Sequence, residues 1–306
     1  MAKRKKLNKR VVIFLVLAGA VVAAGGAALI FKNLPRDPEV YLRRARDAEA
    51  AKPPRLFDAE KDYLRAIDAA SDPKAEYYYD LARIQLEIRK QPNIPQAERS
   101  ARLGRAIDLY RTALRRDPQF RKAQESLTEV YWLMAVTGGQ WQAFITEADR
   151  MISMVPDDDQ TYFKRAIAKS RMAETIPGTY TEAAIADFRK TIELKPDEPD
   201  HWLQLIAFLK RINRSAEAEQ VFAESLETVP DSAKLRVEYA GHLSAKGEKD
   251  RALEQIQQAI TREPDSTLGH LELASFYTRE QDLDKAMESL EAARKVDDSD
   301  YLVYQT

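Results

Sequence analysis

The residues that most often carry chemistry are sparse and scattered in this chain. It has three histidines, His201, His242 and His270, and no cysteine among its 306 residues. A chain without cysteine offers no disulfide, thiolate metal site, thiol nucleophile or iron–sulfur cluster. The histidines fall at different positions of the predicted first helices of three consecutive repeating units, so no common face collects them as metal ligands. We interpret all three as packing or surface residues.

Two other motifs that suggest a binding site also have a structural explanation. The acidic run Asp157–Asp159 follows Pro156, at the point where the next helix should begin. Carboxylates there would cap that helix and complement its dipole. The same explanation covers the acids after later prolines, Asp197, Asp231 and Asp265. Because a GxxxxGK[ST] phosphate loop is also absent, the sequence predicts no catalytic residue, no metal, no cofactor and no enzyme activity.

Charge is distributed unevenly along the chain. Six of the 48 basic residues and no acidic residue lie within the first ten positions, which leaves 42 basic against 49 acidic residues, a formal charge of −7, for the rest. A body with this charge should repel the phosphates of nucleic acid. We therefore expect no nucleic-acid partner.

An uninterrupted apolar stretch follows the basic tail. The segment from Val11 to Phe31 contains no charged residue, and a helix of that length spans roughly 30 Å, the thickness of a bilayer core. The stretch predicts a single transmembrane helix between a basic cytoplasmic tail (residues 1–10) and a linker (residues 32–37). The alternative is a cleaved signal peptide, whose apolar region is usually shorter, about 7 to 15 residues.

The basic tail also predicts the orientation of this span. Its six cations outnumber Lys32 and Arg36 on the other side, so the positive-inside rule places the N-terminus in the cytoplasm. We expect a single-pass protein of the cytoplasmic (inner) membrane with an extracytoplasmic or periplasmic body. Small residues four apart, such as Gly19 and Ala23, would allow two spans to pack as a homodimer; an anchor without a partner is the alternative.

The rest of the chain carries an internal repeat in which each unit ends on a proline. Twelve residues before each proline lies a small or apolar residue, and four residues later a second one follows on the same helical face. Proline cannot continue that helix and ends it. These prolines, at intervals of 38, 40, 34 and 34 residues, are Pro118, Pro156, Pro196, Pro230 and Pro264, and the preceding pairs are Ala106 and Tyr110, Phe144 and Ala148, Ala184 and Phe188, Ala218 and Phe222, and Ala252 and Ile256.

This pattern resembles the tetratricopeptide repeat (TPR) over about residues 38–306, and most closely from Pro196 to Asp298, where the 34-residue period holds. The resemblance implies an all-α, right-handed TPR superhelix, an α-solenoid of helical hairpins. A generic helical bundle would not keep such fixed offsets, and Sel1 or HEAT repeats have periods that fit less well. The expected units are 38–73, 74–118, 119–156, 157–196, 197–230, 231–264, 265–298 and the start of another at 299–306, with inserts between the helices at 91–96, 137–140 and 176–180.

In the TPR family, positions 2, 5, 9, 12 and 13 of each first helix face a ligand in a concave groove. Carried over to this chain, the resemblance implies an apolar floor with a basic rim. Such a groove would suit an extended or helical peptide with hydrophobic anchors and acidic side chains; packing between units is the alternative role for each position. The candidate groove residues are Tyr79, Arg83, Lys122, Trp132, Phe163, Leu203, Lys210, Arg211, Val237, Leu271 and Arg279.

These features together predict a membrane-anchored scaffold that binds protein or peptide partners, by family resemblance in a cell-envelope assembly. Two alternatives stay open. An organelle import receptor also joins an N-terminal anchor to TPR units, in the opposite orientation. Because the last unit stops at Thr306 soon after it begins, we also expect a fragment, which could be the regulatory or binding region of a longer enzyme or transporter.

Overall fold

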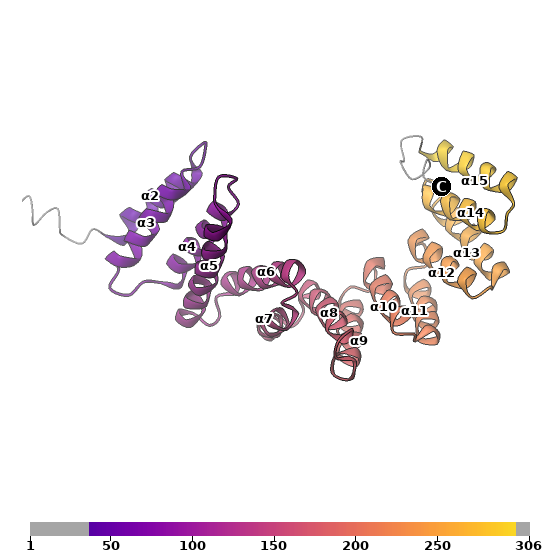
Figure 1. The fold of residues 1–306 in the computed structure, drawn as a ribbon, viewed down its shortest axis with the longest axis horizontal. Helices are drawn as coiled ribbons and strands as arrows, with labels where there is room; N and C mark the ends of the chain where they lie inside the picture. Colours follow the sequence, from indigo (N-terminus) through magenta and orange to yellow (C-terminus); the bar gives the residue numbers. More distant parts are fainter. Residues whose placement is uncertain (1–36, 298–306) are drawn as a thin grey trace, which may run out of the picture. The chain divides into compact units, whose positions relative to one another are not determined.

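The computed structural model of the protein describes residues 37–297, and the secondary structure of these residues is entirely helical (Figure 1). The prediction of an all-α fold is therefore confirmed for this part of the chain. Its fourteen helices are α2 (Pro38–Ala50), α3 (Leu56–Ala69), α4 (Ala75–Arg89), α5 (Gln96–Arg116), α6 (Arg121–Gly138), α7 (Trp141–Met154), α8 (Asp159–Ala173), α9 (Pro177–Leu194), α10 (Pro199–Arg211), α11 (Ser215–Thr228), α12 (Ala233–Ala245), α13 (Lys249–Arg262), α14 (Thr267–Arg279) and α15 (Leu283–Val296).

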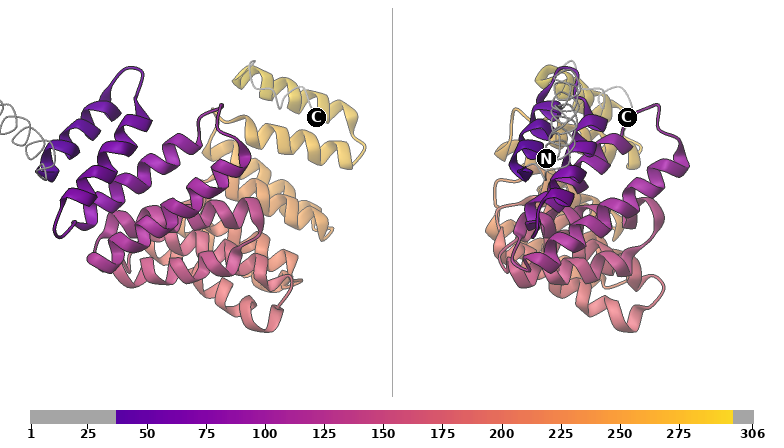
Figure 2. Two further views of the ribbon diagram at one scale, coloured as in Figure 1. Left: turned by 60° about the vertical axis from the view of Figure 1, so that its left-hand side comes forward. Right: turned by 90° about the vertical axis from the view of Figure 1, so that its left-hand side faces the viewer.

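Successive helices pack as hairpins within two compact units, Met1–Ala123 and Gln124–Thr306. In the first unit α2 packs on α3, α4 packs on α5, and α3 also contacts α4. In the second unit the pairs are α8 with α9, α10 with α11, α12 with α13, and α14 with α15; Figures 1 and 2 both show the last pair side by side. The first helices α10, α12 and α14 also contact one another in succession, so they share one face.

The repeated prolines mark where the second helix of a hairpin stops. Helix α5 ends two residues before Pro118, and α7, α9, α11 and α13 end at the same distance from their prolines. The intervening residue leaves the helical region, as Asp117 does with φ −134°, because proline disfavours a helical conformation in the residue before it. Helix α15 stops in the same way two residues before Asp298, so the spacing survives the loss of proline.

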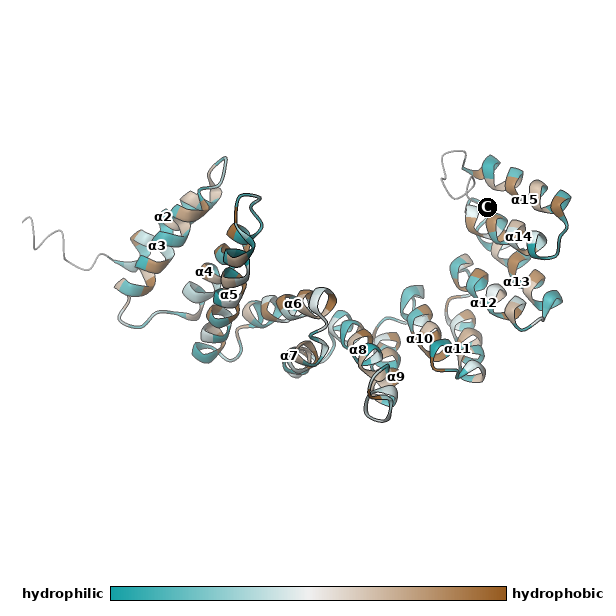
Figure 3. Ribbon diagram, in the orientation of Figure 1, coloured by the Kyte–Doolittle hydropathy of each residue, from teal (hydrophilic) through white to brown (hydrophobic). Residues whose placement is uncertain are grey.

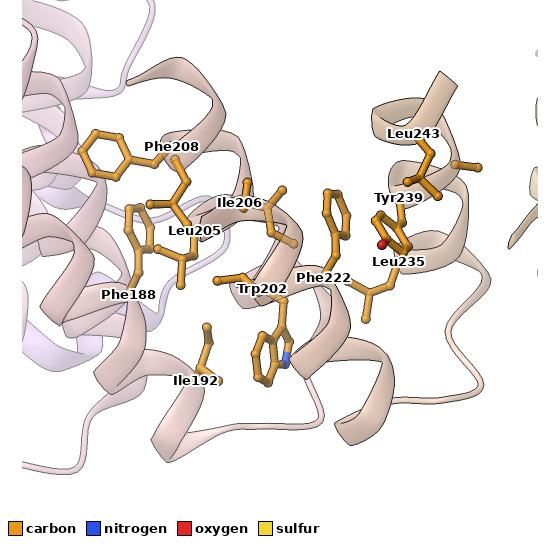
Figure 4. Packing of buried hydrophobic residues seen from close by; sticks show 14 of the residues in the cluster. Phe188, Ile192, Trp202, Leu205, Ile206, Phe208, Phe222, Leu235, Tyr239 and Leu243 are labelled. Carbon is orange, nitrogen blue, oxygen red and sulfur yellow. The ribbon is translucent and has the colours of Figure 1, made fainter. Parts of the chain in front are cut away.

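The paired residues of the repeat form the core. Ala218 and Phe222 are fully buried, as are the corresponding pairs on α5, α7, α9 and α13. The helices in Figure 3 accordingly show both hydrophobic and hydrophilic residues along their length. In the second unit a continuous cluster joins successive hairpins, and the ring centroids of Phe222 and Tyr239 lie 4.8 Å apart within it (Figure 4). Each such buried side chain contributes on the order of 1.5–3 kcal/mol.

The turns of the last three hairpins share one backbone conformation at a 34-residue spacing. Asn213, Gly247 and Gln281 all have positive φ, at 63°, 80° and 61°. Glycine adopts this conformation freely and asparagine tolerates it, whereas glutamine rarely does. The shared turn keeps the two helices of each hairpin in the same register.

Two of the predicted inserts differ from the structure in extent. Helix α9 begins at Pro177, so most of residues 176–180 are helical, because proline is well suited to the first position of a helix. Helix α6 likewise continues through Thr137 and Gly138, and the turn begins at Gly139, where φ is +71°. The insert at 91–96 does lie between two helices, α4 and α5.

The predicted capping by aspartate side chains is wrong for α8, α10, α12 and α14. The N-cap residue of α10 is Glu198 rather than Asp197, and no side-chain hydrogen bond caps that helix. Ser232 and Ser266, not the preceding aspartates, accept the backbone N–H bonds that cap α12 and α14. Asp231 pairs instead with Arg262 at 2.8 Å. Asp158 is the N-cap residue of α8, but its carboxylate accepts a hydrogen bond from the Thr161 hydroxyl and none from the backbone. The serine hydroxyl lies closer to the first turn in these hairpins and takes the role.

The predicted transmembrane span, Val11–Phe31, and the start of a further unit, 299–306, lie outside the described residues. Between residues 37 and 297, no helix combines the length and the apolar character needed to cross a bilayer.

Candidate functional site

The most regular surface of the second unit is the face that α10, α12 and α14 share. The 34-residue period places equivalent residues of these three helices side by side in two rows. We call these six residues the first-helix face. The fifth position of each helix forms an apolar row and the ninth a row of small residues: Leu203, Val237 and Leu271, then Ala207, Gly241 and Ser275.

The apolar row is partly occupied by packing within the protein. Leu271 is buried and belongs to a small cluster with Ala293 and Leu290. Leu203 is half-buried and packs against the main core of the unit. Val237, the middle residue of the row, is also half-buried. The predicted floor residues are therefore brought together, with Leu203 and Val237 keeping part of their surface open to solvent.

The row of small residues is more open. Ala207 is exposed, and a methyl group added to Gly241 would meet no atom within 4 Å. Gly269, in contrast, lies against the neighbouring hairpin, where an added Cβ would come within 2.7 Å of Ile260 Cγ1. Packing thus explains Gly269, whereas nothing in the described residues requires glycine at position 241. Our sequence reasoning missed these ninth-position residues, although a helical glycine in register with Ala207 and Ser275 was the available signal.

The predicted basic rim divides into one unpaired cation and two that are bound. Lys210 is exposed, and its ammonium group has no ion pair or hydrogen bond with any described residue. Arg211 lies 3.6 Å from Glu174 and donates to the Ser170 hydroxyl at 3.3 Å. Arg279 pairs with Glu272 of its own helix at 2.7 Å. Lys210 is the rim cation with its full charge available to a ligand.

The aromatic candidates of the second unit contact other rings of the protein. Trp132 lies 5.1 Å from Phe144 and 6.1 Å from Trp141, with the ammonium of Lys164 5.9 Å from its ring. Both Trp132 and Phe163 are half-buried. These rings join neighbouring helices of the unit, which accounts for much of their apolar surface.

Phe163 shows the same behaviour beside a buried histidine. Its ring lies 5.1 Å from the imidazole of His201 and 6.5 Å from the ring of Phe188. His201 is buried and its Nδ1 has no hydrogen-bond partner. The pair therefore packs one hairpin against the next.

Two candidates of the first unit lie together on α4, where the guanidinium of Arg83 is 6.0 Å from the ring centroid of Tyr79. Tyr79 contacts the rings of Tyr110, at 5.8 Å, and Phe120, at 5.3 Å. Arg83 pairs with Glu49 at 2.7 Å and lies 3.7 Å from Asp80, whose pKa is raised by burial.

Lys122, at the start of α6, is exposed and has no ion pair with any described residue.

His242, like His201, packs against aromatic rings inside the unit. It is buried between Phe222 and Tyr239, with ring centroids 5.5 Å and 6.4 Å away, and its Nε2 has no hydrogen-bond partner. Burial lowers the pKa of its imidazole, and the charges of Lys210 and Lys246 lower it further. Among the described residues no group of histidines and carboxylates is arranged to hold a metal ion.

A buried ion cluster joins α7, α8 and α9. The carboxylate of Asp187, 7% exposed, accepts bonds from Arg165 and Lys169, each at 2.7 Å. Arg165 also contacts Asp149 at 2.5 Å on the solvent side, where that carboxylate is 56% exposed. Two cations and two carboxylates balance, so the cluster is explained by packing between the hairpins.

Comparisons with known proteins agree with this architecture. The family model described as "Tetratricopeptide repeat" matches residues 242–300. The structure of the C-terminal part of a TPR repeat-containing protein from Cytophaga hutchinsonii is similar with a TM-score of 0.52 and 16% identity, covering 97% of this chain and 98% of that one. No match is found among curated proteins.

Two further structures are similar at lower TM-scores. A tetratricopeptide repeat protein from Parabacteroides merdae has a TM-score of 0.47 and 15% identity, over 88% of this chain and 96% of that one. Yeast Tom70 has a TM-score of 0.47 and 16% identity, over 88% of this chain and 55% of its own. The family-model match shows a tetratricopeptide repeat at residues 242–300, and the similarity to the Cytophaga protein shows that the helical hairpins of this chain share its fold.

Proposed function

We propose that this chain is a membrane-anchored scaffold that binds protein or peptide partners on its first-helix face. The observation that carries the proposal is Gly241. A glycine inside a helix costs about 1 kcal/mol relative to alanine, and this one has open space where a side chain would lie. Packing inside the protein does not explain why glycine is present here in spite of its cost to helix stability. A partner that approaches the backbone closely at this point would explain it.

The surroundings of Gly241 indicate the chemistry of the partner. Leu203 and Val237 offer partly exposed apolar surface beside the small row, which suits an apolar side chain of a ligand. Lys210 has no ion pair with the described residues and suits an acidic group. We therefore propose a peptide segment with an apolar anchor and a nearby carboxylate, bound in either a helical or an extended form.

The membrane part of the proposal depends on the sequence of the N-terminal region. The apolar length of Val11–Phe31 favours a transmembrane anchor, and the six cations before it favour a cytoplasmic N-terminus. The repeat body would then act on the extracytoplasmic side, in a cell-envelope assembly. Protease added to spheroplasts tests this topology with a tag placed after Thr306: digestion of the tag supports it, and protection contradicts it.

Photo-crosslinking in cells tests the binding face. A crosslinking amino acid in place of Ala207, on the first-helix face, should capture a discrete partner. The matched control replaces Ala223, an exposed alanine on second helix α11, and should capture none. Gly241→Trp would fill the open space and should abolish the Ala207 adduct while the protein stays folded. Equal adducts at both alanines, or an adduct that persists with tryptophan, would refute this face as the binding site.

A further inference from the structure

One end of the first-helix face is covered by a side chain of its own helix. The guanidinium of Arg279 donates to the Ser275 hydroxyl at 3.0 Å and to Glu272 at 2.7 Å, so the side chain folds back along α14. Ser275 is the ninth residue of α14 and the last member of the row of small residues. Arg279 therefore lies against this end of the row, whereas Ala207 is exposed and Gly241 has open space beside it.

The arginine at the same position of an earlier first helix has a different partner. Arg211 is the thirteenth residue of α10, as Arg279 is of α14. Its guanidinium reaches the preceding hairpin and donates at 3.3 Å to the hydroxyl of Ser170, the twelfth residue of α8. It also lies 3.6 Å from Glu174, just after that helix. An arginine at this position can thus be held by the hairpin before it.

The corresponding hydroxyl is present for Arg279 but is unused. Ser244 is the twelfth residue of α12, and α12 contacts α14. The repeat therefore places Ser244 toward Arg279 as it places Ser170 toward Arg211. The Oγ atom of Ser244 is buried and has no hydrogen-bond partner among the described residues. Because a buried hydroxyl without a partner is unfavourable, Ser244 offers Arg279 an alternative position.

The ion pair that holds Arg279 on α14 is partly open to solvent. The side chains of Arg279 and Glu272 are 46% and 17% exposed, and ion pairs near the surface contribute little to stability because water screens their charges. At Ser244 the guanidinium would exchange one hydroxyl hydrogen bond for another and would satisfy a buried group. The two positions of Arg279 therefore differ little in free energy, and a ligand that favours one of them can select it.

We propose that Arg279 is a gate at the α14 end of the first-helix face. In the free protein its guanidinium lies against Ser275. When a partner covers the row of small residues, the guanidinium moves to the Ser244 hydroxyl, in the manner of Arg211 at Ser170. This gate rests on the binding function proposed for the face. Its opening extends the accessible row from two first helices to three, so it selects a peptide segment long enough to cross α10, α12 and α14.

Photo-crosslinking from position 207 of the full-length protein in cells tests the gate, with short irradiation so that the yield follows occupancy. Glu272→Gln weakens the hold on Arg279 and should raise the yield of the adduct about two- to fivefold, the factor that corresponds to an exposed ion pair. Ser244→Ala removes the alternative hydrogen-bond partner and should lower the yield at least about twofold. Glu193→Gln is the matched control: it breaks an exposed ion pair on second helix α9 and should leave the yield unchanged.

Two further measurements show whether these effects act through Arg279. In an Arg279→Ala background, neither Glu272→Gln nor Ser244→Ala should change the yield of the adduct. In urea unfolding, the purified Ser244→Ala variant should be as stable as the wild type, because the Ser244 hydroxyl makes no hydrogen bond in the free protein. Effects on the yield that persist without Arg279, or a lower unfolding midpoint for Ser244→Ala, would overturn the gate.

The adduct from position 207 also separates the gate from the proposed binding function. A higher yield with Glu272→Gln together with a lower yield with Ser244→Ala supports both. An adduct whose yield is the same in these variants and in the Glu193→Gln control overturns the gate alone. A yield that falls with Glu272→Gln, or one that does not fall with Ser244→Ala, likewise overturns the gate and leaves the binding face. The absence of any adduct overturns the binding face and the gate with it.

Discussion

Replacing Gly241 by alanine should stabilise the second unit by about 0.5–1 kcal/mol. Alanine loses less backbone entropy than glycine when a helix forms, which gives this magnitude for an interior position. The added methyl group would meet no atom within 4 Å, so no steric cost opposes the gain. The backbone at Gly241 is helical and does not need the left-handed region that favours glycine.

The same substitution at Gly269 should have the opposite sign. There the new Cβ would lie 2.7 Å from Ile260 Cγ1, 3.0 Å from Ile260 N and 3.3 Å from Ile260 Cα. The backbone atoms cannot move away without shifting α13, and overpacking of this kind costs about 1–3 kcal/mol. This cost outweighs the helix gain, so the net effect should be destabilisation of about 1–2 kcal/mol.

Urea unfolding followed by circular dichroism measures both variants against the wild type. The midpoint should rise for Gly241→Ala and fall for Gly269→Ala, with similar slopes. Repeat proteins can unfold in steps, so the comparison uses the transition that includes α12–α14. A Gly241→Ala variant that is destabilised would refute the claim that its surroundings are open, and a stabilised Gly269→Ala variant would refute the close contact with Ile260.

Three further predictions concern the core of the second unit. Asp187→Asn should destabilise it by about 3 kcal/mol because two cations lose their buried carboxylate, whereas Asp149→Asn, on the exposed side of the same cluster, should cost less than about 1 kcal/mol in the same urea assay. Burial holds the pKa of His242 below its ordinary value of 6.5, so stability should decrease as the pH falls below that value toward the folded-state pKa. His242→Phe should flatten this pH dependence of stability between about pH 7 and pH 5.5. If stability changes with pH as steeply in the variant as in the wild type, His242 is not the group responsible. Phe222→Ala should cost about 3–5 kcal/mol in thermal unfolding, while Leu283→Ala, at a side chain 64% exposed, should change stability by less than about 0.5 kcal/mol.

The arrangement of the candidate site was only partly predictable from the repeat register. The register brought Leu203, Val237 and Leu271 to one face, because a 34-residue period repeats each helix position. It did not reveal that Leu271 is buried while Val237 keeps an open side. That difference depends on the packing of the neighbouring helices, which differ in sequence from one hairpin to the next.

The ionic partners were also beyond sequence reasoning. Lys210, Arg211 and Arg279 look equivalent as a basic rim, yet two of them are bound to carboxylates. Arg211 reaches Glu174 of another hairpin, whereas Arg279 pairs with Glu272 two turns earlier on its own helix. Which carboxylate a long side chain reaches depends on distances of a few ångströms in the folded protein, and the repeat register does not set these distances. The same limit applies to the helix caps, where Ser232 and Ser266 act in place of the neighbouring aspartates.

The sequence by itself determined the helical class, the length of the repeat and the positions where second helices end. These features follow from local rules: helical periodicity, the small and large residues four apart, and the backbone restriction that proline imposes. Tertiary structure alone decided which apolar side chains are left outside, such as Phe57 and Leu64, and that Gly241 lies open while Gly269 is enclosed. Exposure depends on atoms contributed by other hairpins, and a local pattern contains no information about their distance.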